Sequence, residues 1–148
     1  MSGLFISKEL REVRDNIRRT EDDIINISKQ IYEILESDLL KAQHQKGEDY
    51  ITYTVDRKIG KTHNLIKLAV EYKYPLIVHD ASWARALQRS VKKECGENIS
   101  ILSYRSAGNI MDGIPCDIIL KDEMVPIETL RDILNSSGKG YVNVVGIN

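Results

Sequence analysis

Cysteine is scarce in this chain, and its two copies do not form a metal-binding pattern. Cys95 and Cys116 have no CxxC spacing and no pair of histidines nearby. Zinc-binding motifs depend on such spacings, so the sequence argues against a zinc site. The simplest interpretation is two reduced thiols in a protein of the cytosol.

The chain also lacks a long apolar run, a targeting segment and an excess of charge of one sign. The apolar stretch from Met1 to Ile6 is too short for a signal peptide, and no window reaches the length that spans a bilayer. The formal net charge is -1, whereas proteins dominated by nucleic-acid binding usually carry a basic excess. We therefore expect a soluble cytoplasmic protein without membrane contact, in which any nucleic-acid contact comes from a local basic patch.

What is present is the composition of an ordinary globular protein, since 42% of the 148 residues are apolar and 29% are charged. This length suits one domain, or one domain with an appendage. The character of the chain changes near Gly47. Residues 1–48 are helical in pattern, with no proline and with no glycine between Gly3 and Gly47, whereas residues 49–148 alternate short apolar runs with amphipathic segments. We expect an N-terminal helical segment followed by the main domain.

The N-terminal segment repeats apolar residues at alternating steps of four and three. Ser7 is a suitable N-cap for a long helix. The repeat is interrupted only at Thr20 and runs through Ile6, Leu10, Val13, Ile17, Ile24, Ile27, Ile31 and Ile34. Such a heptad seam predicts a coiled coil, and with it a homo-oligomer that is a dimer, trimer or tetramer. A single helix that packs its apolar stripe on its own domain gives much the same pattern, so both interpretations stand.

Residues 49–148 predict an α/β domain. Apolar and β-branched runs indicate strands at Tyr50–Val55, Leu76–Val78, Ile99–Tyr104, Asp117–Leu120 and Tyr141–Ile147. Amphipathic segments between them indicate helices at Lys61–Tyr72, Ser82–Glu94 and Ile127–Leu134. Strands that alternate with helices predict a mostly parallel sheet with helices on both faces, which is a three-layer arrangement.

A basic segment joins the first strand of this domain to its first helix. It reads Val55-Asp56-Arg57-Lys58-Ile59-Gly60-Lys61-Thr62. Successive backbone N–H groups before a helix form a cradle for anions, and a glycine lets phosphate approach closely. In such a cradle Lys61 would reach the β- and γ-phosphates of a nucleotide, and the Thr62 hydroxyl would bind Mg²⁺. The alternative is a basic turn that only caps the helix.

A second motif, Ile118-Ile119-Leu120-Lys121-Asp122-Glu123, is an apolar strand that ends in two carboxylates. A carboxylate at the end of a buried strand can hold the water shell of Mg²⁺. A neighbouring glutamate can orient or deprotonate an attacking water. Lys121 interrupts the apolar run, and we expect it to point to the surface or to form an ion pair. The alternative is an acidic turn without a ligand.

Together the two motifs resemble the Walker A and Walker B elements of the P-loop NTPase superfamily. The Arg-x-x-Gly-Lys-Thr core is similar to the loop of phage terminase large subunits and some helicase-like ATPases, and the resemblance covers roughly Tyr50 to Asn148. The chain departs from the usual loop at its first glycine, where Val55 stands. The resemblance implies a Mg²⁺–ATP site whose nucleotide-binding residues are Arg57, Lys58, Ile59, Gly60, Lys61, Thr62 and His63.

The resemblance also assigns roles within this site. Asp122 and Thr62 would hold the metal, Glu123 would activate the attacking water, and Lys61 would neutralise phosphate charge. Asn148, after the last strand, would sense the γ-phosphate; the alternative is a frayed terminal residue. The family further implies that the strand before the loop lies centrally, beside the Walker B strand. A phage-type ATPase would work in the host cytoplasm.

Several other polar residues and one aromatic residue are candidates. His63 would approach the nucleotide or face solvent, and His79 with Asp80 would form a catalytic pair or, as we expect, a strand-end cap. Trp83 would stack on a base, although core packing is the expectation. Arg105, like Arg57 and Lys58, would contact phosphate or a partner subunit's nucleotide, against the default of a solvated surface.

These patterns favour a small ATPase that acts as an oligomer or as a subunit of a nucleic-acid-related machine, with a protein or nucleic-acid partner. The alternative is a non-enzymatic adaptor or regulator with a degenerate nucleotide pocket, which would work through its N-terminal helix. The missing first glycine favours the adaptor, and the intact Lys-Thr and Asp-Glu pairs oppose it. A nucleotide kinase is disfavoured because no arginine-rich lid is visible.

Overall fold

The computed structural model describes residues 23, 25–53, 61–106 and 116–148. Its strands are β1 (Asp49–Thr52), β2 (Leu76–Val78), β3 (Ile101–Ser103), β4 (Ile118–Lys121) and β5 (Asn143–Ile147). Its helices are an N-terminal helix over residues 25–42, α2 (Lys61–Tyr72), α3 (Ala81–Cys95) and α5 (Ile127–Ser136), with the short 3-10 turn η1 (Tyr104–Ser106). Strands and helices alternate along the chain, as the sequence predicts.

The strands form a single five-stranded sheet in the order β1-β5-β4-β2-β3, and every pairing is parallel. The predicted α/β class and the parallel sheet are therefore confirmed. The expected place of the first strand is wrong. β1 is an edge strand, and β5 lies between it and β4. All five carboxyl ends lie at one edge of the sheet, because the strands are parallel.

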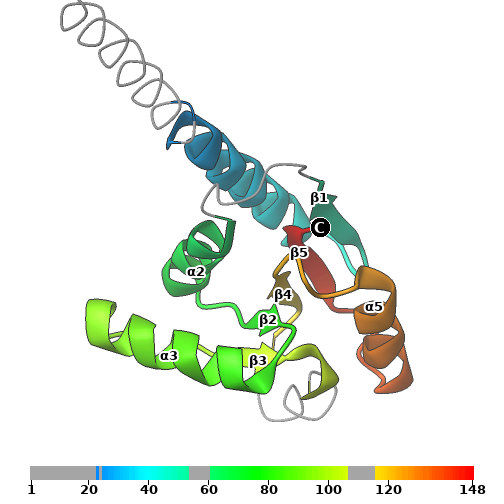
Figure 1. The fold of residues 1–148 in the computed structure, drawn as a ribbon. Coiled ribbons are helices and arrows are strands. Elements are labelled where there is room, and N and C mark those ends of the chain that lie inside the picture. Colours follow the sequence, from blue (N-terminus) through cyan, green and yellow to red (C-terminus); the bar gives the residue numbers. More distant parts are fainter. Residues whose placement is uncertain (1–22, 24, 54–60, 107–115) are drawn as a thin grey trace, which may run out of the picture.

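Helices cover both faces of this sheet (Figure 1). One face carries the N-terminal helix, α2 and α3, and the other face carries α5. Successive strand residues alternate between the two cores: Leu76 and Val78 of β2 face the first, whereas Ile77 faces the second. Burial on both faces explains why the inner strands β2 and β4 are mostly apolar without alternation, whereas the edge strand β1 is only partly buried.

Local signals set the helix ends. Asp80 is the N-cap of α3, and its carboxylate accepts a hydrogen bond from the Trp83 backbone N–H at 3.3 Å. Gly96 ends the same helix with a left-handed φ of 69°. α2 stops at Tyr72 because Lys73 adopts a φ of 62°, and Pro75, two residues later, has no backbone N–H to continue the helix.

The N-terminal helix packs its apolar stripe on its own domain. Its buried residues Ile31, Leu35, Leu39 and Ala42 belong to the core that α2 and α3 share with the sheet. The Asn64 amide of α2 donates to the Ser28 carbonyl at 2.9 Å and to its hydroxyl at 3.1 Å. Ile34, expected in the seam, is 46% exposed. Residues 25–42 thus pack on the domain as a single helix. The seam before residue 23 lies outside the described residues, so the coiled coil stays a prediction.

None of the helices that the structure describes combines the length and the apolar character needed to cross a membrane.

Candidate functional site

The start of α2 meets the end of β4 at the carboxyl edge of the sheet. The Lys61 ammonium donates to Glu123 Oε2 at 2.8 Å. The adjacent Thr62 hydroxyl donates to Asp122 Oδ1 at 3.1 Å. Two sequence motifs some sixty residues apart thus contact each other through two neighbouring pairs of side chains.

The four side chains differ in their exposure to solvent. Lys61 and Asp122 are 6% and 4% exposed, whereas the Glu123 side chain is 38% exposed. The backbone of Asp122 is fixed from β2, because its N–H donates to the Ile77 carbonyl at 3.0 Å. The Asp122 backbone is therefore anchored to β2, and the Glu123 side chain keeps a path to solvent.

This arrangement has the chemistry of an anion and cation site. Lys61 supplies a positive charge at the first residue of a helix, where backbone N–H groups also attract anions. Thr62 and Asp122 supply two oxygen ligands, the kind that Mg²⁺ prefers, and these oxygens lie 3.1 Å apart. No three His, Cys, Asp or Glu side chains in the described part of the chain could hold a metal by themselves. A cation here would need further ligands, and nucleotide phosphates commonly supply them.

The other predicted nucleotide-binding residues are placed only in part. Arg57, Lys58, Ile59 and Gly60 lie outside the described residues. Asn148 is exposed at the end of β5, where its backbone N–H donates to the Thr52 carbonyl at 2.9 Å. Its sensor role stays a prediction.

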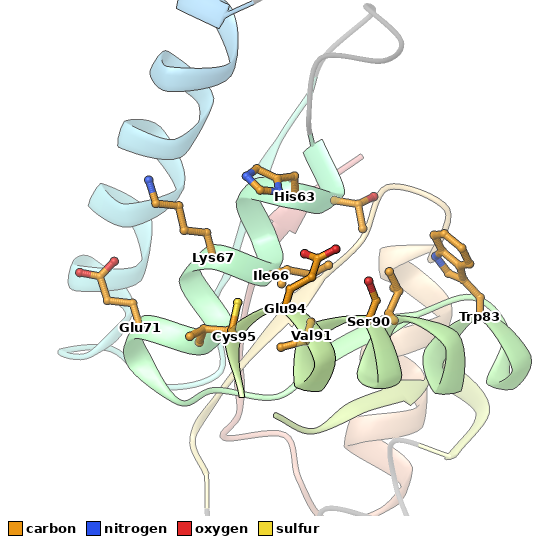
Figure 2. A pocket seen from close by; sticks show the side chains of 12 residues that line it. His63, Ile66, Lys67, Glu71, Trp83, Ser90, Val91, Glu94 and Cys95 are labelled. Carbon is orange, nitrogen blue, oxygen red and sulfur yellow. The ribbon is translucent and has the colours of Figure 1, made fainter. Parts of the chain in front are cut away.

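A groove of about 710 Å³ begins at the site and runs between α2 and α3. Thr62 and the exposed His63 lie at one end, and Figure 2 shows His63 and Trp83 on opposite sides of it. Ile66 and Val91 contribute to its apolar lining. The core packing expected for Trp83 is wrong, because the indole is 42% exposed and lines this groove.

Lys121 is the largest departure from expectation near the site. Its side chain is 0% exposed, so the expected surface position is wrong. The ammonium donates to two backbone carbonyls, Asp122 O at 2.9 Å and Ile147 O at 2.5 Å. Burial lowers the pKa of Lys121 to about 8, against the opposing effect of the nearby Asp122 and Glu123 charges.

The minor candidates have structural positions. Asp80 caps α3, which confirms the strand-end cap, and His79 before it is exposed. The Arg105 guanidinium lies 5.7 Å from the Tyr104 ring centroid, and its Nε donates to the Tyr104 hydroxyl at 3.4 Å. Among the described residues, no hydrogen bond or ion pair joins Asp80 or Arg105 to Lys61 or Glu123.

Sequence reasoning missed one buried polar residue, which lies at the amino edge of the sheet, opposite the candidate site. Asn143, the first residue of β5, is 1% exposed and binds three backbone groups in the connection from the N-terminal helix to β1. A polar residue at the start of an otherwise apolar strand was the available signal.

Comparison with known proteins gave no match to a protein-family model, a curated protein or a solved structure.

Proposed function

We propose that this chain binds ATP with Mg²⁺ and hydrolyses it, as a P-loop NTPase-like protein. The observation that carries the proposal is the double contact between α2 and the end of β4, Lys61 with Glu123 and Thr62 with Asp122. The resemblance assigns phosphate to Lys61, the metal to Thr62 and Asp122, and activation of the attacking water to Glu123. A purely structural turn has no need to bring all four groups together at a helix N-terminus.

The Lys61–Glu123 ion pair implies a first step. Lys61 cannot neutralise a phosphate while its ammonium is held by a carboxylate 2.8 Å away. Nucleotide binding would therefore exchange Glu123 for phosphate oxygens around Lys61. The exchange frees the Glu123 carboxylate, which is exposed enough to accept a proton from a water molecule. The ligand-free protein thus keeps its base occupied until a phosphate arrives.

The second pair would serve the cation. Thr62 and Asp122 would hold Mg²⁺, which when bound supplies charge neutralisation on the phosphates. Asp122 is suited to this role because its backbone is hydrogen-bonded to β2 and its side chain is 4% exposed. The reaction class is attack of water on the γ-phosphate, with positioning and electrostatics as the main contributions of the protein.

Calorimetric titration of Mg²⁺–ATP, with phosphate release measured on the same samples, tests the proposal. Hydrogen bonds to charged groups contribute about 1.5–3 kcal/mol, so Lys61→Ala should weaken binding by about 10- to 100-fold. Lys73→Ala is the matched control, since Lys73 also lies 2.8 Å from a glutamate, Glu97, but on the exposed surface. Its affinity should equal that of the wild type.

Glu123→Gln separates binding from hydrolysis. The amide cannot accept the proton of the attacking water, so phosphate release should fall by about 100-fold or more. Binding should be retained or strengthened, because the substitution also releases Lys61 from its ion pair. Binding without hydrolysis in the wild type would instead favour the nucleotide-regulated adaptor. Absence of any binding would refute both nucleotide hypotheses.

Oligomerisation belongs to the same proposal. A homo-oligomer joined through the N-terminal segment, or assembly with a nucleic-acid-related partner, would fit the resemblance to terminase and helicase-like ATPases. Sedimentation of the full chain with and without Mg²⁺–ATP tests this; a monomer under both conditions would contradict self-association.

A further inference from the structure

Lys121 is a charged side chain in the middle of the sheet. It is the only charged residue in the described part of the chain with 0% exposure. Fully buried lysines are rare unless they are paired. Here the two acceptors of the ammonium are the backbone carbonyls of Asp122 and Ile147. A buried charge used in this way calls for an explanation beyond the packing of β4.

The two carbonyls lie at the carboxyl ends of adjacent strands. In the parallel register Lys121 of β4 pairs with Gly146 of β5, so Asp122 and Ile147 each follow the paired position by one residue. The ammonium therefore links the two strand ends at the edge of the sheet that carries the candidate site. The Asp122 carbonyl also accepts from the Val125 N–H at 3.2 Å. Together these contacts hold the peptide between Asp122 and Glu123.

Gly146 makes room for this link. A Cβ at that position would lie 2.3 Å from the Lys121 carbonyl oxygen and 2.7 Å from the Lys121 Cβ. Only a glycine lets β5 approach β4 this closely without a shift of backbone. The close approach brings the end of β5 within reach of the Lys121 ammonium.

We propose that Lys121 is a positioning residue, which ties the ends of β4 and β5 and so aims the Asp122 and Glu123 carboxylates at Thr62 and Lys61. The role rests on the proposed function, because it serves the same phosphate and metal site. An apolar side chain of similar length would fill the volume but would leave the two carbonyls without this donor. The strand ends would then be free to separate, and the Asp122 and Glu123 carboxylates would no longer be held toward Thr62 and Lys61.

Lys121→Met in the full chain tests the role by two readouts. The first is amide hydrogen exchange, which needs no nucleotide. Exchange at the Val125 N–H, whose acceptor is the Asp122 carbonyl, should accelerate at least tenfold, whereas exchange in the middle of α3 should not change. The second is Mg²⁺ activation of ATP hydrolysis. The Mg²⁺ concentration that gives half-maximal hydrolysis (the Mg²⁺ midpoint) should rise about tenfold and kcat should fall, with the KM for ATP nearly unchanged. Lys73→Met is the control for the substitution itself and should match the wild type.

The outcomes separate this role from the proposed function. A folded Lys121→Met protein with wild-type exchange at Val125, or with a wild-type Mg²⁺ midpoint, overturns the positioning role. A wild type that does not hydrolyse ATP refutes the proposed function alone. Exchange at the Val125 N–H then still decides the tie between the strand ends: faster exchange in Lys121→Met supports it, and wild-type exchange overturns it. If Lys121→Met does not fold, Lys121→Gln decides. Its shorter amide cannot span both carbonyls, so a Mg²⁺ midpoint above that of the wild type supports the role and a wild-type midpoint overturns it.

Discussion

Replacement of Asn143 by leucine should loosen the connection between the N-terminal helix and β1 from the sheet. The Asn143 amide donates to the Ala42 carbonyl at 2.6 Å and to the Gln45 carbonyl at 2.8 Å, and its oxygen accepts from the Glu48 N–H at 2.9 Å. All three partners belong to the segment between the last turn of the helix and β1. One buried side chain thus binds three backbone groups at the end of the helix and beyond it; the Ala42 carbonyl also accepts from the Gln45 N–H at 3.3 Å.

The size of the effect follows from those three bonds. Leucine has nearly the shape of asparagine but can neither donate nor accept. Each lost hydrogen bond costs about 1 kcal/mol net, and a buried group left without a partner costs more, so we expect a loss of about 3–5 kcal/mol. This is a large part of the total stability of a domain, which is about 5–15 kcal/mol.

Urea unfolding of wild type and Asn143→Leu, followed by circular dichroism, measures this loss. Asn98→Leu is the control, because Asn98 is exposed and surface substitutions usually change stability by less than about 0.5 kcal/mol. Hydrogen exchange should localise the damage to the last turns of the N-terminal helix and to β1. A loss below about 1 kcal/mol would refute the reasoning, since the three contacts would then contribute nothing together.

Two further predictions concern close packing and thiol chemistry. Gly146→Ala should destabilise the fold by about 3 kcal/mol or more, since its Cβ would lie 2.3 Å from the Lys121 carbonyl oxygen. Gly140→Ala is the control and should cost far less, because its Cβ would meet only the Asn135 side-chain amide, at 2.9 Å. Equal thermal unfolding midpoints for the two variants would contradict this prediction. Burial raises the pKa of the Cys116 thiol from 9.0 to about 11, so its thiolate fraction at pH 8 falls by about 100-fold. In single-cysteine variants treated with iodoacetamide, Cys116 should therefore be alkylated slowly, at a rate that rises as the pH approaches 11. The exposed Cys95 should be alkylated fast. Equal alkylation rates of the two cysteines at pH 8 would contradict the burial argument.

The elements of the fold are largely visible in the sequence because their signals are local. The predicted helix at Lys61–Tyr72 has the bounds of α2, and α3 extends the predicted Ser82–Glu94 by one residue at each end. Asp80 and Gly96 explain this agreement, since caps act over a single turn. The candidate site was predicted for the same reason: Lys61 starts a helix, and Asp122 follows a strand.

The order of the strands was not visible. The place of β1 at the edge, with β5 between it and β4, depends on which strands pair and which faces pack together. The inner strands β2 and β4 are buried on both faces alike, so their sequences do not distinguish their neighbours. The resemblance supplied an order, and that order was wrong in its placement of the first strand. Trp83 was misplaced for a related reason, because an apolar residue on a helix can face either the core or a groove between helices.

The sequence by itself determined the α/β alternation, the helix ends and the identity of the two motifs, since each depends on neighbours along the chain. Only the tertiary structure decided that Lys61 meets Glu123, that Thr62 meets Asp122, and that Lys121 is buried against two carbonyls rather than exposed. These contacts join residues of different elements. They arise because parallel strands bring their carboxyl ends to one edge of the sheet, whatever their separation in the chain.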